Sequence, residues 1–532
     1  MAQSRRRFLE RLAGTAGAAM TYEAMVGMGL LAVPTRPAGA FSLQAGSLGS
    51  GAGGTRVVIL GGGLAGLSTA YELGKLGYDV TVLEARRRPG GRCYTVKKGM
   101  ASEEEGVASS QVCGFDDGQY FNPGPMRIPH HHTATLAYCR ELGVPLEVLT
   151  SDDNESAYVY LRNSTKLAGR KLREREVRAD IGGYTAELLA KAVGAPGVLD
   201  ARMTAADEEA LLEYLNRAGA LTSRKYTGGQ KRGFREVPGY GTKAGTPSTP
   251  LPLPDLVQSR SATSVLTEYL HQAPMFQVVG GQSGLAYAFA SKLGDRVIYG
   301  ADVQAITQSA TGVEIAYVKD GQPQQAAAHY GVYAMPLNLM AGLKLADFRP
   351  ELKTALGAIT YASSGKIGMQ FKRRFWEEDD GIYGGISKTD MEITNIIYPS
   401  SGYLGTKGVL VGYYQSGTRA EDTGKKPHQA REALALEQGA LIHPQYPAEF
   451  ENSFSVSWQN VKYNKGAWAQ LGPAHRKGVY LELLKPDRRM YFAGDHCTYL
   501  VAWMAGALES GREVATAIHT RATQDVRSTA GA

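Results

Sequence analysis

Three glycines stand at fixed intervals after a short apolar run, and an acidic residue follows about twenty residues later. The run is Val57–Leu60, followed by Gly61, Gly63 and Gly66, with Glu84 beyond them. In such a turn the first glycine allows a sharp bend, the second lets a pyrophosphate approach, and the third lets a helix pack on the strand. The helix N-terminus offers N–H groups to phosphates, and Glu84 can accept hydrogen bonds from a ribose 2′-OH while repelling a 2′-phosphate. The spacing predicts a dinucleotide site and favours FAD or NAD over NADP.

These residues can act together only if a strand precedes the glycines and a helix and a second strand follow. Residues 57–60 and 80–83 are apolar runs of strand type, and the stretch between them has helical spacing. Alternating patterns predict further strands at Val297–Tyr299, Val303–Gln308, Val313–Val318 and Val409–Tyr414. Helical patterns occur at Thr133–Leu142, Glu174–Gly194 and Ala205–Ala220. Residues 222–254 are rich in Gly, Pro, Thr and Lys and are expected to form a long loop.

Length and composition narrow the class of protein. A chain of 532 residues is too long for one compact core, so two or more domains are expected. The net charge of +7 is mild, and no basic block interleaved with aromatic residues indicates nucleic-acid binding. The four cysteines have no C-x-x-C spacing, so neither a metal site nor a disulfide framework is expected. His130, His131 and His132 do not indicate a metal either, because adjacent side chains on a helix diverge.

The N-terminus carries the pattern of an export signal. Ser4-Arg5-Arg6-Arg7-Phe8-Leu9 precedes a weakly apolar stretch, and Ala38 and Ala40 form a candidate cleavage site. The pattern resembles a twin-arginine signal, which exports folded proteins, although Glu10 and Glu23 depart from it. We therefore expect a periplasmic or secreted protein, with a disordered basic tail as the alternative. No later stretch is long and apolar enough to span a bilayer.

After the second strand the chain resembles the flavin-containing amine oxidase family. Residues 84–92 read EARRRPGGR and match the family motif E-A-R-x-x-x-G-G-R. The resemblance implies that the glycine pair lets the backbone approach FAD and that Arg92 neutralises the pyrophosphate. Residues 124–129, GPMRIP, resemble the L-amino acid oxidase branch, in which the Gly-Pro-Met backbone passes the flavin ring and the arginine holds the substrate α-carboxylate. A planar guanidinium suits this role because it grips a carboxylate with two parallel hydrogen bonds; a structural ion pair is the alternative for Arg127.

Two further segments resemble parts of the family's substrate site. Ser364-Gly365-Lys366-Ile367 matches a segment whose lysine lies near flavin N5 and holds an ordered water. A buried cation there would help reduced flavin react with O2, or position the water, whereas a surface lysine on a strand is the alternative. If one residue is inserted after Trp376, Tyr413 falls where the family places a tyrosine hydroxyl on the substrate carboxylate. Tyr414 could compete for that role.

The C-terminal segments resemble the family's flavin-ring surroundings. Trp458 and Ala467 match a stretch beside the flavin ring, where monoamine oxidases carry a cysteine bonded to the flavin. Alanine has no nucleophile, so non-covalent FAD is expected, and no bond to Cys497 is expected. Residues 491–495, YFAGD, resemble the family's final cofactor strand. There Asp495 would bind ribityl or phosphate oxygens, and the helix beginning near Met504 would point its positive end at flavin N1 and C2=O.

The resemblance assigns roles residue by residue. Ala502 would accept a hydrogen bond from the substrate amine through its carbonyl, and Trp503 would form one wall of the substrate cage unless it is a core aromatic at a helix start. The implied catalytic residues are Lys366, Arg127, Tyr413 and Trp503, and the substrate-binding residues are Arg127, Tyr413, Ala502 and Trp503. The implied cofactor-binding residues are Gly61, Gly63, Leu64, Ala65, Gly66, Glu84, Ala85, Arg86, Gly91, Arg92, Gly124, Pro125, Met126, Arg127, Val303 (by its backbone, at the adenine), Trp458, Ala467, Gly494, Asp495, Ala502, Trp503 and Met504.

Taken together, these features predict an α/β fold with a Rossmann-like, glutathione-reductase-like FAD-binding domain that is discontinuous in sequence. We also expect an α+β substrate-binding domain and a helical insertion. The expected parts are a signal peptide at 1–40, a linker at 41–54, FAD-binding segments at 55–125, 276–344 and 471–522, a helical substrate-entry region at 126–275, a substrate-binding domain at 345–470, and a tail at 523–532.

The predicted function is FAD-dependent oxidation of L-amino acids by O2, with a 2-oxo acid, ammonia and H2O2 as products. A monoamine or polyamine oxidase is disfavoured, because an amine without a carboxylate offers Arg127 no anion to bind. A tryptophan 2-monooxygenase-like enzyme shares the carboxylate anchor and stays open, as does a non-catalytic FAD-binding protein. The partners expected are a small L-amino acid and O2. The resemblance also implies a homodimer or higher homo-oligomer, which nothing in the sequence decides.

Overall fold

The structure is a computed structural model that describes residues 54–108, 110–150, 156–164, 166–193, 204–229, 231–236, 245–258 and 275–530. A five-stranded parallel sheet with the order β10-β2-β1-β14-β21 brings together three stretches that are far apart in sequence. Its strands are β1 (Arg56–Leu60), β2 (Asp79–Glu84), β10 (Val297–Tyr299), β14 (Tyr330–Tyr333) and β21 (Met490–Phe492). The apolar runs seen in the sequence are typical of parallel strands covered on both faces.

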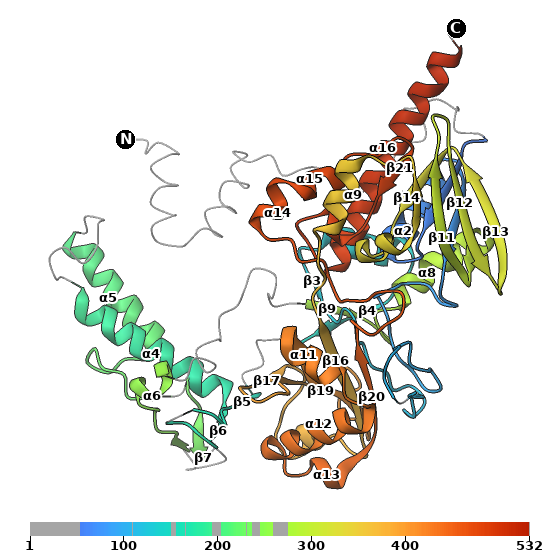
Figure 1. The fold of residues 1–532 in the computed structure, drawn as a ribbon. Helices are drawn as coiled ribbons and strands as arrows, with labels where there is room; N and C mark the ends of the chain where they lie inside the picture. The colour runs from blue at the N-terminus through green and yellow to red at the C-terminus, as the bar shows by residue number, and fades with distance from the viewer. Residues whose placement is uncertain are drawn as a thin grey trace. The chain divides into compact units, whose positions relative to one another are not determined.

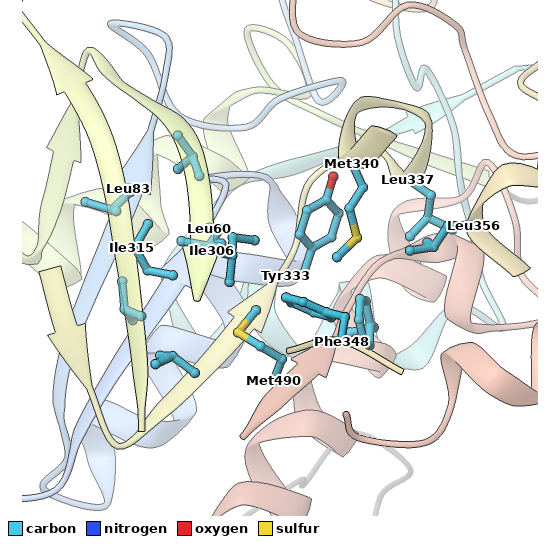
Figure 2. Close-up of a cluster of buried hydrophobic side chains, with 14 of the residues drawn as sticks. Leu60, Leu83, Ile306, Ile315, Tyr333, Leu337, Met340, Phe348, Leu356 and Met490 are labelled. Carbon is cyan, nitrogen blue, oxygen red and sulfur yellow. The ribbon is translucent and has the colours of Figure 1, made fainter. Parts of the chain in front are cut away.

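Helices and a second sheet cover these strands. Helix α2 (Leu64–Lys75) contacts β1 and β2, and helix α16 (Met504–Ala530) packs along α2 (Figure 1). The second sheet has the order β13-β12-β11-β15 and consists of β11 (Ala301–Gln308), β12 (Val313–Lys319), β13 (Gln322–Ala328) and β15 (Lys344–Ala346). Figure 2 shows the core between the two sheets, where Leu60, Leu83 and Tyr333 meet Ile306 and Ile315.

A seven-stranded sheet forms the other large layer. Its order is β20-β16-β19-β18-β17-β5-β6, and its strands are β5 (Tyr158–Tyr160), β6 (Lys171–Arg173), β16 (Ser364–Phe371), β17 (Ile386–Thr389), β18 (Asn395–Ile397), β19 (Gly408–Ser416) and β20 (Phe450–Ser457). Strand β16 pairs antiparallel with both β19 and β20, and all its residues are buried. Because it has strand neighbours on both sides, β16 can hold a polar side chain in a defined place.

Smaller elements connect these layers. A three-stranded sheet has the order β3-β9-β4, with β3 (Ile128–Pro129), β4 (Leu146–Leu149) and β9 (Met275–Val278), and a hairpin pairs β7 (Phe234–Glu236) with β8 (Thr246–Pro247). Among the described residues, the other α-helices are α3 (Thr133–Glu141), α4 (Glu174–Ala192), α5 (Ala205–Gly219), α6 (Leu253–Gln258), α8 (Gly284–Leu293), α9 (Pro350–Gly357), α10 (Phe375–Glu378), α11 (Gly417–Gly424), α12 (His428–Ile442), α13 (Tyr446–Glu449), α14 (Pro473–Lys477) and α15 (Val479–Leu483). Three 3₁₀ helices are η1 (Gly294–Arg296), η2 (Leu337–Gly342) and η3 (Asp495–Cys497).

Every strand and helix that the sequence analysis predicted by its residue range is confirmed, to within a few residues at each end. The α/β class with its sequence-discontinuous parallel sheet is confirmed as well. The loop predicted over residues 222–254 is wrong in part, because β7, β8 and the start of α6 lie inside it. Pro252 and Pro254 suggested a loop, but proline is compatible with the first turn of a helix.

The predicted signal peptide and linker lie outside the described residues, apart from Gly54. In the part of the chain that the structure describes, no helix combines the length and the apolar character needed to cross a membrane. The same described residues hold no group of three or more His, Cys, Asp or Glu side chains that could bind a metal ion.

Candidate cofactor and substrate site

A cavity of about 600 Å³ opens at the carboxyl ends of the parallel strands. Gly61 follows β1, Glu84 ends β2, Ala334 follows β14 and Gly494 follows β21, and all four line the cavity. Ligands of open α/β sheets bind in a crevice at this edge, because the loops that follow the strands converge there. The cavity is therefore where a dinucleotide is expected.

The glycine turn has the local geometry that its sequence predicts. Gly61 has a φ of +108°, and a Cβ on it would lie 2.8 Å from the Ala334 carbonyl oxygen. A Cβ on Gly66 would lie 2.1 Å from the Gly61 oxygen, so only glycine lets α2 sit this close to β1. A Cβ on Gly63 would meet no atom within 4 Å, and Gly63 lines the cavity. The predicted turn and helix packing are confirmed; Gly66 acts through packing and does not line the cavity.

Glu84 is 4% exposed and is held by backbone donors on both oxygens. Its Oε2 accepts from the Gly62 N–H at 2.7 Å, and its Oε1 accepts from the Arg86 N–H at 2.8 Å. Each carboxylate oxygen has a second lone pair, which leaves it able to accept a ribose hydroxyl. The Arg86 side chain also lines the cavity and donates to Glu103 at 2.7 Å and to Asn464 at 2.6 Å.

Arg92 and the buried Asp495 form a partly buried ion pair in the cavity wall. Arg92 also donates to the Ala467 carbonyl at 2.6 Å, and Asp495 accepts from the Ala502 N–H at 2.8 Å. Burial raises the pKa of Asp495, but the charge of Arg92 and the hydrogen bonds from Arg92 and the Ala502 N–H contribute to a net pKa below the ordinary value. The pair thus ties the E-A-R-x-x-x-G-G-R segment to the C-terminal motif around one charged patch.

Lys366, on β16, is 4% exposed and reaches the GPMR segment. Its Nζ donates to the Gly124 carbonyl at 2.6 Å and to the Asn122 carbonyl at 3.4 Å, and it lies 4.5 Å from the Tyr414 ring centroid. Burial, and then the charge of Arg127, lower the pKa of Lys366 well below its ordinary value. Lys366 is therefore a buried lysine that is harder to protonate than a surface lysine, and the surface-lysine alternative is wrong.

Tyr413 does not reach the cavity, and this part of the prediction is corrected. Tyr413 pairs with Ile367 across β16 and β19 and lies in the apolar cluster with Met369 and Phe371. Tyr414 pairs with Lys366 and lines the cavity. Side chains alternate between the faces of a strand, so an error of one residue in the alignment moves a side chain to the other face. Here a register shift follows Ile367, and no periodicity argument could have placed it.

Arg127 lines the same cavity as Lys366 and Tyr414. Its charge lowers the pKa of Lys366 and opposes the rise that burial gives to the pKa of Tyr414. Arg127 and Met126 also line a second cavity of about 700 Å³, whose wall includes Glu147 and Gln277. A guanidinium is thus held between two cavities, beside a tyrosine and a lysine.

Trp503 and its neighbours close another part of the cavity. Ala502 has a left-handed φ of +68°, which turns the chain into α16, and Ala502, Trp503 and Met504 all line the cavity. The Trp503 ring meets the His132 ring edge-on, with centroids 4.9 Å apart. Burial, and then His131, lower the pKa of His132 to about 4, so this ring is neutral at neutral pH. The sequence patterns did not indicate His132 as a neighbour of Trp503.

Of the predicted cofactor residues, all but Gly66 line the first cavity, including Val303 on β11, Trp458 and Ala467. Trp458 donates its indole N–H to the Pro123 carbonyl at 3.0 Å. Other lining residues were not predicted, among them Tyr463, Asn464 and His496. Each lies inside or next to a segment that was recognised, so proximity to the motifs was the signal that could have found them.

Known proteins similar in sequence to this chain include amine and amino acid oxidases. The family described as flavin-containing amine oxidoreductase matches residues 64–519. An L-amino-acid oxidase from Siganus canaliculatus is 29% identical over 482 residues, which cover 87% of this chain and 85% of that protein. An L-amino-acid oxidase from Bothrops jararacussu is 28% identical over 492 residues, covering 86% of this chain and 89% of that protein.

Solved structures share the fold at lower identity. Putrescine oxidase bound to putrescine superposes with a TM-score of 0.58 at 19% identity, covering 87% of this chain and 98% of the other. Cyclohexylamine oxidase from Brevibacterium oxydans gives a TM-score of 0.56 at 17% identity, covering 88% of this chain and 99% of the other. At such identities the likeness establishes the fold alone.

Proposed function

Because the chain belongs to the flavin-containing amine oxidoreductases, we propose that it is an FAD-dependent L-amino acid oxidase. The reaction converts an L-amino acid, O2 and water to a 2-oxo acid, ammonia and H2O2. The observation that carries the proposal is Arg127, whose guanidinium lines the cavity beside Lys366 and Tyr414. An amine without a carboxylate offers no anion for a guanidinium to bind, whereas an amino acid does.

The residues in the wall fit a flavin dinucleotide. Gly63 leaves open space at the N-terminus of α2, and Glu84 keeps lone pairs for a ribose. Arg92 supplies positive charge at the same edge. When bound, FAD supplies the hydride acceptor for the substrate Cα–H and the route of electrons to O2.

Arg127 and Tyr414 are proposed to bind the substrate α-carboxylate, Arg127 with two parallel hydrogen bonds and Tyr414 with its hydroxyl. The Ala502 carbonyl accepts from the substrate amine, and Trp503 forms a wall of the cage. Two anchors at one end of the substrate fix the direction of the Cα–H bond, and correct positioning can contribute much of the rate. The role first expected of Tyr413 thus passes to Tyr414.

Lys366 is proposed to hold a water molecule. Its Nζ already donates to two carbonyls, and its neutral form also carries a lone pair that can accept a hydrogen bond from water. This water is placed to hydrolyse the imino acid product. Through this water, the Nζ of Lys366 would connect the backbone of the GPMR segment with the reacting end of the substrate.

Three further features are part of the proposal. Ala467 offers no nucleophile, so FAD is bound without a covalent bond; all flavin should then remain in the supernatant when the protein is precipitated by acid. The N-terminal pattern directs export of the folded protein by the twin-arginine route. The protein is expected to form a homodimer or larger homo-oligomer, which size-exclusion chromatography with light scattering tests.

The test of function is H2O2 release across L-amino acids, D-amino acids and simple amines. Release confined to L-amino acids is the expected result. Release with amines alone would contradict the role of Arg127. An amide and CO2 in place of a 2-oxo acid would identify the monooxygenase reaction, which uses the same carboxylate anchor. A flavin that stays oxidised under anaerobic L-amino acid would identify a non-catalytic flavoprotein.

A further inference from the structure

The small sheet of β3, β9 and β4 turns one face towards the second cavity. On β4, Leu149 is buried and lines this cavity, whereas Val148 is 60% exposed and is not part of its wall. Successive side chains of a strand point to opposite faces of the sheet. The cavity side is therefore the face that carries Leu149 and, two residues earlier, Glu147, which also lines the cavity.

Strand register places Arg127, Gln277 and Glu147 in one row across this face. Glu147 pairs with Gln277 on β9. On the other side of β9, Ile128 pairs with Phe276. Continuing this antiparallel register by one residue brings Arg127 opposite Gln277, and all three members of the row line the second cavity. Neighbouring strands lie about 4.8 Å apart, so the backbones at Arg127 and Glu147 are separated by about 10 Å.

Glu147 is a partly exposed carboxylate with few partners. Its Oε1 accepts from the Gln277 amide at 2.8 Å, and no lysine, arginine or histidine of the described chain forms an ion pair with it. Burial raises the pKa of Tyr120, a hydrogen bond with Ser401 opposes this rise, and the charge of Glu147 adds to it. Tyr120 lines the same cavity. A carboxylate accepts several hydrogen bonds, so Glu147 has acceptor capacity left beside the tyrosine.

Other charged side chains in this wall differ from Glu147. Ion pairs with described residues are formed by Asp116, Asp117, Arg374 and Lys407. A cation that enters the cavity would have to compete for the acidic members of these pairs. Glu147 offers its carboxylate without such competition from the described part of the chain.

From this row we infer that the second cavity holds the substrate side chain and that Glu147 binds a cationic group at its end, as in L-lysine, L-ornithine or L-arginine. The inference rests on the oxidase function proposed above, with Arg127 as the carboxylate anchor. Arg127 and Met126 line both cavities, so a substrate held there can have its Cα in the first cavity and its side chain in the second. The flexible four-carbon stem of lysine suits the space between the two ends of the row.

The test compares L-lysine with L-norleucine, which has the same carbon chain and lacks the terminal ammonium. Wild type should have the higher kcat/KM with L-lysine. Glu147→Gln keeps the shape of the side chain and removes its charge. It should lower the ratio of kcat/KM for L-lysine to that for L-norleucine about ten- to a hundredfold, the effect of losing a hydrogen bond to a charged group. A ratio equal to that of wild type would overturn the inference.

Asp117→Asn is the matched control. It removes one negative charge from the same wall, but the Asp117 side chain is 88% exposed and pairs with Lys98 at 3.1 Å. Because solvent weakens such a charge, the ratio should stay as in wild type. Equal losses in Asp117→Asn and Glu147→Gln would show that only the total charge of the cavity matters. A lower melting temperature in Glu147→Gln with an unchanged ratio would leave Glu147 as a structural partner of Gln277.

Binding measured without turnover separates this inference from the proposed oxidase function. Flavin absorbance recorded without O2 gives dissociation constants for both amino acids, whether or not the flavin is reduced. Weaker binding of L-lysine but not of L-norleucine in Glu147→Gln supports the inference even if no H2O2 forms, and the oxidase function alone then fails. H2O2 release from L-norleucine, with no preference for L-lysine in wild type, would support the oxidase function and overturn the inference.

Discussion

Two walls of the main cavity are built in different ways. The glycine wall (Gly61, Gly63 and Glu84) comes from a single strand–helix–strand unit, and backbone N–H groups of that segment hold the Glu84 carboxylate. The side-chain wall (Arg127, Lys366 and Tyr414) joins three separate segments, and strand register decides which atoms meet. Substitutions that add volume should disturb the glycine wall. The side-chain wall should instead respond to a change of functional group or of the strand face on which a side chain lies.

The largest expected effect is at Arg127. Arg127→Met should lower kcat/KM for L-amino acids more than a hundredfold, because two charged hydrogen bonds of about 1.5–3 kcal/mol each are lost. FAD content should not change, since the glycine wall is untouched. Steady-state kinetics with a flavin absorbance count measures both. Arg127→Lys, which keeps the charge without the planar fork, should fall between; wild-type kinetics in Arg127→Met would exclude the carboxylate role.

A smaller effect is expected on the glycine wall, and there it should appear as stability. Gly66→Ala places a Cβ 2.1 Å from the Gly61 oxygen, so α2 must move away from β1. Overpacking of this kind costs about 1–3 kcal/mol of the free energy of unfolding, and FAD affinity should fall with it. Chemical denaturation of the apoprotein measures the loss.

Gly182 in α4 is the control for that substitution, because a Cβ there meets no atom within 4 Å. Gly182→Ala should be neutral or stabilise by about 0.5–1 kcal/mol, the usual difference between glycine and alanine in a helix. Equal stability changes for Gly66→Ala and Gly182→Ala would show that the close contact between α2 and β1 is not required.

Adjacent tyrosines provide the next test. Tyr414→Phe should raise KM for L-amino acids about ten- to a hundredfold, because one hydrogen bond to a charged carboxylate, of about 1.5–3 kcal/mol, is lost. Tyr413→Phe should leave KM unchanged, since that side chain lies in the apolar cluster on the other face. The reverse result would mean that the register of β16 and β19 differs from the one described.

The smallest effect expected is a pH dependence from Lys366. Its pKa in the folded protein is lowered well below the ordinary 10.5, so the unfolded chain binds more protons between these two values and stability rises with pH in that window. Lys366→Met removes this slope. As the pH is raised towards 10.5, the free energy of unfolding of wild type should increase relative to that of Lys366→Met. Denaturation curves recorded at several pH values measure this change. A difference that does not change with pH would indicate that Lys366 has an ordinary pKa.

Local chemistry accounts for the features that the sequence alone predicts. Gly61 and Gly66 are needed by a turn that spans few residues. Short apolar runs predict β1 and β2, alternation predicts β11 and β12, and the stretch 409–414 predicts β19. The motifs around Arg92, Arg127 and Asp495 are contiguous, so their residues were found together. Nearly all of the predicted cofactor residues accordingly line one cavity.

Other features depend on contacts between segments hundreds of residues apart. Whether Tyr413 or Tyr414 faces the cavity depends on a register shift in the pairing of β16 with β19. The lowered pKa of Lys366 depends on burial and on the charge of Arg127, which comes from another segment. Turn and strand preferences act between residues close in sequence, so short stretches of sequence are enough to predict them. Burial, strand register and competition for hydrogen-bond partners are decided only when distant segments come together in the folded chain.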